Sequence, residues 1–131
     1  MGITQEGIEG EQKLFKLLRK SKFDFFQPDA IGFHGGKYYL FECKHQEQFT
    51  PPPFYGHGLP KWQVEARLKF EEETNIKAIL VVFDKKTNEI FWQSLKKLNS
   101  DPKNYIDTKG LKPRRVYNIE CFINIKQVTW T

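Results

Sequence analysis

The sequence has little of what stabilises secreted proteins or anchors membrane proteins. Its two cysteines, Cys43 and Cys121, each lie inside an apolar run typical of a strand. We therefore expect buried free thiols rather than a disulfide, and no Cys/His spacing typical of a metal site is present. No apolar segment is long enough to span a bilayer, and the first residues are acidic and polar, unlike a secretory signal. These absences predict a cytoplasmic protein that does not interact with membranes.

Internal repeats and low-complexity tracts are also absent, and the composition argues against disorder. The 131 residues include twelve Phe, five Tyr and three Trp, which is enough for the core of one domain. The formal net charge is +5 and the isoelectric point is near 9.2. Such a charge fits a polyanionic partner such as a nucleic acid. The alternative interpretation is a basic surface that only keeps the protein soluble.

The most informative stretch begins at Asp29 and ends at Lys44. Two apolar runs, residues 30–33 and 38–41, flank a Gly-Gly pair at residues 35–36, a pattern that predicts a tight antiparallel hairpin. Alternate side chains of a strand share a face, so Glu42 and Lys44 point the same way and Cys43 points the opposite way. The hairpin also brings Asp29 beside Glu42. Two carboxylates and one ammonium are therefore predicted to meet at one edge of a small sheet.

Such a cluster has the chemistry of a Mg²⁺ site. Mg²⁺ prefers one or two carboxylates together with waters and substrate phosphate. Asp29 and Glu42 supply the carboxylates, the backbone carbonyl of Cys43 supplies a third oxygen, and Lys44 orients a metal-bound water or neutralises phosphate. Mn²⁺ is expected to substitute. In the alternative interpretation, Glu42 and Lys44 pair on a solvated strand face and Asp29 only caps a turn.

A first helix is predicted over residues 4–20. Its apolar residues recur at three- and four-residue spacing and define a buried stripe: Ile8, Leu14, Phe15 and Leu18. Glu11 falls at the centre of this stripe, and a carboxylate that faces the core needs a partner. We expect Glu11 to join the metal site, although a glutamate near a helix N-terminus can also act only on the helix dipole. Lys13 lies away from the stripe, where it can meet phosphate or solvent.

The middle of the chain predicts a proline-rich connection, a second helix and a central strand. Residues 51–60 form either a substrate gate, with Tyr55 or His57 near DNA, or a rigid linker. The helix over residues 60–74 has Trp62, Ala66 and Phe70 as its buried stripe and places Gln63 near the strand ends, where it bonds Lys44 or only caps backbone groups. The apolar run at residues 79–83 predicts a strand parallel to the one that carries Glu42.

The last third of the chain is predicted to be less regular. A strand over residues 89–93 leads to a short helix over residues 95–98, which Ser94 caps. Residues 99–115 are polar and basic, and we expect a loop there that contacts phosphates or is simply exposed. A final strand over residues 116–123 extends the sheet or supplies a dimer edge.

Together these motifs resemble the PD-(D/E)xK nuclease superfamily, and within it the archaeal Holliday-junction resolvases and their phage relatives. The similarity covers residues 5–98, and the residues at matching places are Glu11, Asp29, Glu42, Lys44 and Gln63. The sequence departs from the resolvase pattern before Pro28, where the glycine-rich loop with a catalytic serine is missing. This departure leaves general nuclease chemistry as the broader expectation. The small size and the resemblance also suit a phage origin.

The resemblance implies an α/β fold of the restriction-endonuclease type, with a mixed sheet between layers of helices. It implies one nuclease-like domain over residues 1–131, with residues 99–131 as a basic loop and terminal strand. The implied activity is Mg²⁺-dependent cleavage of branched or junction DNA by a homodimer. The alternatives are a DNA-end, flap or restriction-type nuclease, and a nucleic-acid-binding module without catalysis. The expected DNA contacts are Lys13, Tyr55, His57, Arg67, Lys109, Lys112, Arg114 and Arg115.

Overall fold

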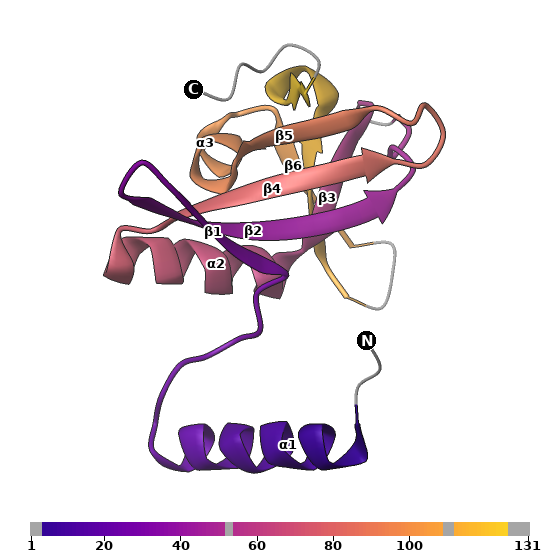
Figure 1. Ribbon diagram of the computed structural model, residues 1–131. Coiled ribbons are helices and arrows are strands. Elements are labelled where there is room, and N and C mark those ends of the chain that lie inside the picture. Colours follow the sequence, from indigo (N-terminus) through magenta and orange to yellow (C-terminus); the bar gives the residue numbers. More distant parts are fainter. Residues whose placement is uncertain (1–3, 52–53, 109–111, 126–131) are drawn as a thin grey trace.

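The structure, a computed structural model, describes residues 4–51, 54–108 and 112–125. Two sheets and their helices make up most of this part of the chain (Figure 1). The five-stranded sheet has the order β1-β2-β4-β5-β8, and the three-stranded sheet has the order β3-β7-β6. The elements are α1 (Gln5–Lys20), β1 (Ala30–His34), β2 (Lys37–Gln46), β3 (Gly56–Pro60), α2 (Lys61–Thr74), β4 (Lys77–Asp84), β5 (Ile90–Ser94), α3 (Leu95–Ser100), β6 (Asn104–Asp107), β7 (Arg114–Asn118), a 3₁₀ helix (Ile119–Cys121) and β8 (Ile123–Asn124).

The predicted hairpin and parallel strand are both present. β1 pairs with β2 in antiparallel register, and the turn residues Gly35 and Gly36 both have positive φ, as a type I′ turn requires. β2 then pairs with β4 in parallel, which is possible because α2 provides the crossover. Ser94 caps α3 by accepting a hydrogen bond from the backbone N–H of Lys97, as predicted.

The core lies between one face of the five-stranded sheet and the two helices α2 and α3. Leu40, Leu80 and Val82 point from the strands, and Val64 and Leu98 point from the helices. The predicted stripe on α2 was partly wrong, because Trp62 is 54% exposed, while Val64 and Arg67 are the residues of α2 that are buried. The helix therefore turns a partly polar face toward the sheet. In the described residues no helix is long and apolar enough to cross a membrane.

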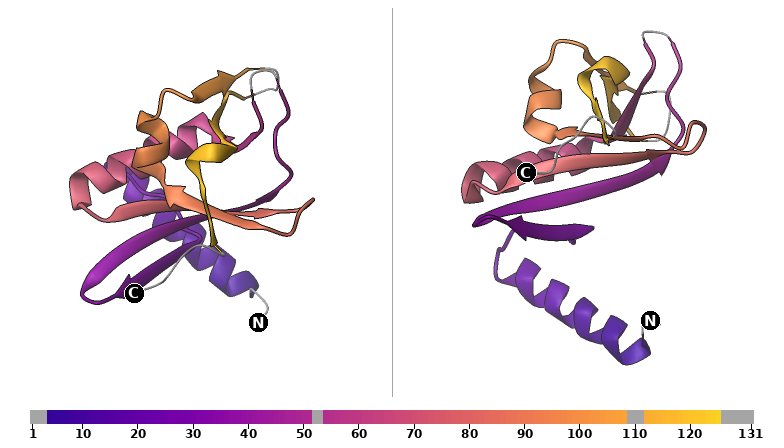
Figure 2. Two further views of the ribbon diagram at one scale, coloured as in Figure 1. Left: turned by 90° about the horizontal axis from the view of Figure 1, so that it is seen from above. Right: turned by 45° about the horizontal axis from the view of Figure 1, so that its top comes forward.

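α1 lies apart from both sheets (Figures 1 and 2). The helix forms as predicted, with Thr4 as its N-cap, but its predicted burial was wrong: none of its residues is buried, and Leu17 is 59% exposed. Its ring contact is a stack of Phe15 on Phe25, in the segment that follows the helix, at 5.2 Å between centroids. That segment attaches instead to α2, where Phe26 packs on Phe70.

The second sheet was not predicted. β7 is its central strand, with β3 on one side and β6 on the other, so the expected basic loop and the proline-rich connection both contain strands. Gly56 and Gly58 permit the close pairing of β3 with β7: an added Cβ would lie 1.9 Å and 2.0 Å from carbonyl oxygens of β7. The expected terminal strand is interrupted by the 3₁₀ helix, and only β8 extends the large sheet.

The expected burial of the two cysteines was wrong for Cys43. Cys43 is exposed on the face of β2 that points away from α2, and Cys121 is half-buried. Both thiols are free, as expected.

Candidate active site

Asp29 is held at the open edge of β2. β1 begins one residue later, with Ala30 opposite Phe41, so Asp29 faces the part of β2 that has no partner on this side. Its Oδ2 accepts a hydrogen bond of 2.7 Å from the backbone N–H of Cys43. Because the N–H and C=O of one strand residue project to the same side, the carbonyl of Cys43 also faces this edge. The carboxylate and the carbonyl oxygen are therefore neighbours.

Glu42 and Lys44 project from the face of β2 that packs toward α2. Glu42 is only 5% exposed, and its Oε1 lies 3.8 Å from the Nζ of Lys44. Burial raises the pKa of the Glu42 carboxyl; Arg67 lowers it, the negative charge of Asp29 adds to the rise, and Lys44 opposes it.

The first two turns of α2 supply the partners of these residues. The side chain of Gln63 accepts a hydrogen bond of 2.8 Å from Lys44 Nζ, one of the two contacts considered for it. Arg67, one turn further on, donates from Nε to Glu42 Oε2 at 2.9 Å. The expected contact of Arg67 with DNA was therefore wrong, since its side chain is buried against a carboxylate. The four-residue spacing of Gln63 and Arg67 was the available signal for this role.

Glu11 does not join this cluster. It lies on α1, which contains no buried residue, and it is exposed rather than directed into a core. Among the described residues it has no hydrogen bond or ion pair. The prediction that Glu11 faces the core was wrong, because α1 lies apart from both sheets (Figures 1 and 2).

The remaining donors suit a single hard cation. In the described ranges, no three His, Cys, Asp or Glu side chains are grouped closely enough to hold a metal ion by themselves. Mg²⁺ needs fewer, because it uses one or two carboxylates and completes its shell with waters and substrate phosphate. Asp29 has one oxygen that accepts no hydrogen bond from the described residues, and the Cys43 carbonyl lies beside it. These atoms and Glu42 Oε1 are the oxygens that a cation could use here.

Basic residues lie next to the first turn of α2. The backbone N–H of Lys61 donates to Pro113 O at 3.0 Å, which brings the start of β7 beside the first residue of α2, two residues before Gln63. Lys112 and Arg114 are exposed there, whereas Arg115 is half-buried and donates to Asn104. Tyr55, the residue directly before β3, is exposed, and Lys13 is exposed on α1. Lys109 lies outside the described residues.

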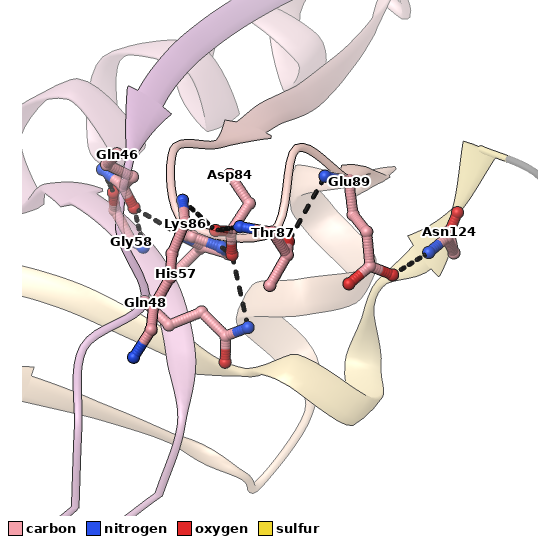
Figure 3. Close-up of polar contacts among 9 residues, drawn as sticks. All are labelled: Gln46, Gln48, His57, Gly58, Asp84, Lys86, Thr87, Glu89 and Asn124. Atoms are coloured by element: carbon pink, nitrogen blue, oxygen red, sulfur yellow. Dashed lines mark hydrogen bonds and ion pairs between the residues drawn. The ribbon is translucent and has the colours of Figure 1, made fainter.

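His57 is not at the surface, so its expected contact with DNA was wrong. It is fully buried, with Nδ1 3.0 Å from Gln46 Oε1 and Nε2 3.1 Å from Asp84 Oδ2 (Figure 3). Burial lowers the pKa of His57, although Asp84 opposes the shift. Burial also raises the pKa of Asp84, but hydrogen bonds, the largest from the backbone N–H groups of Thr87 and Lys86, outweigh it and hold it below its usual value. This network joins β3 to the ends of β2 and β4.

Comparisons with known proteins agree with this architecture. Neither a protein-family model nor a curated protein sequence matches the chain. Among solved structures, the chain is similar to Hjc, a Holliday junction resolvase from the archaeal hyperthermophile Archaeoglobus fulgidus, with a TM-score of 0.51. The sequences are 15% identical, and the match covers 94% of each chain. At this identity the likeness shows the fold alone, and it confirms the predicted fold class: the chain has a mixed α/β fold similar to that of Hjc.

Proposed function

We propose that this protein is a metal-dependent endonuclease that cleaves branched or junction DNA. The observation that carries the proposal is the cluster of Asp29, Glu42, Lys44 and Gln63 at the open edge of β2. Asp29 accepts a hydrogen bond from the backbone of Cys43 there, and Glu42 and Lys44, on either side of Cys43, pair at 3.8 Å, in a fold similar to that of a resolvase. A lone buried ion pair would need neither the exposed Asp29 nor the free strand edge.

The residues have distinct roles in this proposal. Asp29, Glu42 Oε1 and the Cys43 carbonyl would hold Mg²⁺, which lowers the pKa of a bound water and neutralises charge on the attacked phosphate. Gln63 holds the Lys44 ammonium on the α2 side of the strand. The Lys44 side chain is 23% exposed, so its Nζ would be free to contact a substrate phosphate and to orient the attacking water.

The basic residues beside α2 support a nucleic-acid substrate. Lys112 and Arg114 are exposed next to the turn that carries Gln63, so a backbone phosphate can reach them and the cluster together. A four-way junction has two-fold symmetry, and two copies of the chain would supply one site for each of its two cuts. A homodimer is therefore the proposed assembly.

A second candidate is a DNA-binding module without catalysis. The observation that favours it is that both oxygens of Glu42 already face cations, Arg67 and Lys44. If these partners exclude a metal ion, the fold would bind DNA and cut nothing.

The deciding experiment incubates the protein with Mg²⁺ or Mn²⁺ and a four-way junction, a linear duplex or single-stranded DNA. We expect cleavage of the junction, a loss of at least about 100-fold in Asp29→Asn, and junction binding within about twofold of wild type. Asp24→Asn is the matched control, because Asp24 is exposed and pairs with Lys69 outside the cluster. Binding without cleavage under either metal, or full cleavage by Asp29→Asn, would contradict the proposal.

A further inference from the structure

Two side-chain pairs with matching spacing connect α2 to β2. Gln63 bonds Lys44 at 2.8 Å, and Arg67 bonds Glu42 at 2.9 Å. Four residues of a helix advance by about 6 Å. Two residues of a strand advance by about 6.6 Å. The spacing of Gln63 and Arg67 on the helix therefore matches the spacing of Lys44 and Glu42 on the strand. Each of these two strand side chains has its own partner on α2.

We infer that Arg67 is a permanent counter-cation that limits this site to one divalent metal ion. This inference rests on the proposed function, because it concerns the ion of that reaction. Arg67 is a positioning residue: it acts by holding Glu42 Oε2, so only Oε1 remains for the ion. Asp29 then carries the larger share of the ion's coordination.

The charges of the cluster support a single ion. Asp29 and Glu42 contribute two negative charges, and Lys44 and Arg67 contribute two positive charges, so the four side chains sum to zero. One divalent ion adds two positive charges, which two DNA phosphates, or one phosphate and a bound hydroxide, can balance. A second ion would need further carboxylates, and no group of three acidic or other metal-ligating side chains occurs within residues 4–51, 54–108 and 112–125.

Arg67 cannot move aside to make room. It is 4% exposed, and its guanidinium lies 4.3 Å from the centroid of Phe26 and 5.8 Å from that of Trp62. Its Nη1 is buried without a hydrogen-bond partner. The contacts with Glu42 and the aromatic rings therefore hold the guanidinium in place, although one of its donors stays unsatisfied. Lys44 differs, because its side chain is 23% exposed and can turn toward a phosphate.

The test is a calorimetric titration of the DNA-free protein with Mn²⁺. We expect one Mn²⁺ per chain in the wild type. Arg67→Gln keeps a hydrogen-bond donor for Glu42 but removes the charge, so Mn²⁺ should bind about tenfold more tightly. Arg67→Lys keeps the charge, and its affinity should stay within about threefold of wild type. Arg19→Gln on α1 is the matched control and should change nothing.

Each outcome decides the inference. Two Mn²⁺ per chain in the wild type would overturn it, and this readout does not depend on any variant folding. Weaker Mn²⁺ binding by a folded Arg67→Gln, checked by circular dichroism, would show that Arg67 only supports the structure. If the wild type binds Mn²⁺ through Asp29 but Arg67→Gln matches it, this inference alone fails. If the wild type binds no Mn²⁺, the proposed function fails with it.

Discussion

The two long helices, α1 and α2, show opposite relations between sequence pattern and packing. α1 has 16 residues, a regular apolar stripe and no buried residue, whereas α2 has 14 residues, a weaker stripe and two buried residues, Val64 and Arg67. The difference lies in what each helix meets. α2 follows β3 directly and crosses the face of β2, while the linker after α1 attaches to α2 through Phe26.

The comparison teaches that an apolar stripe predicts a helix but not its neighbour. The contacts that position α2 at the site are polar pairs, Gln63 with Lys44 and Arg67 with Glu42, and hydrophobic periodicity does not register them. α1 has an apolar stripe, but no other element of the described structure buries it. The following experiments test this contrast between a helix that serves the site and one that lies apart.

The largest effect is expected from the lysine that α2 holds. Lys44→Met should lower kcat/KM for junction cleavage by about 100- to 10,000-fold, because a positioned group at the reacting water is lost. Lys69→Met, on the exposed side of α2, should stay within about twofold, since Lys69 pairs with Asp24 away from the cluster. Steady-state cleavage of a labelled junction measures both values. Equal losses in the two variants would mean that Lys44 contributes only positive charge and no specific role at the site.

Hydrogen exchange should separate the two helices directly. The backbone amides of α1 are expected to be at least about 100-fold less protected than those of α2, because no buried side chain of α1 has to leave a core when it opens. Exchange followed by mass spectrometry at two protein concentrations measures this. Protection of α1 that rises with concentration would show instead that a second copy covers its apolar face.

Truncating one apolar residue on each helix gives a smaller contrast in stability. Val64→Ala should lower the free energy of unfolding by about 2 kcal/mol, since Val64 is fully buried in the core. Leu17→Ala should cost less than about 0.5 kcal/mol, since most of that side chain is already in water. Urea unfolding curves measure both values. A large cost for Leu17→Ala would mean that α1 packs on something in solution.

The smallest expected effect is a pH dependence of the stability of the part of the fold that contains α2 and both sheets. His57 has a lowered pKa in the folded state, so below about pH 6.5 the unfolded chain binds more protons than the folded chain. The free energy of unfolding therefore decreases as the pH is lowered. We expect a loss of about 1 kcal/mol between pH 7 and pH 5. His57→Gln should flatten this slope, and His45→Gln, at an exposed position, should keep it. An unchanged slope in His57→Gln would assign it to other groups.

Local patterns accounted for the elements around the site. The Gly-Gly turn, the alternation around Cys43 and the apolar run of β4 act between near neighbours, and they predicted the hairpin, the shared face of Glu42 and Lys44, and the parallel pairing. They could not predict the second sheet, because β3, β6 and β7 are short and the pairing of β3 with β7 depends on two glycines that admit a distant strand.

The sequence was enough to predict the hairpin, the shared face of Glu42 and Lys44, and the place of Asp29 beside the end of β2, since strand alternation and a two-residue turn leave little freedom. Tertiary structure alone decided which residues lose their solvent. It buried His57 and Arg67, which read as surface residues, and left Glu11 and the stripe of α1 outside. The physical reason is that burial of a charged or polar group depends on a partner elsewhere in the chain, Asp84 for His57 and Glu42 for Arg67.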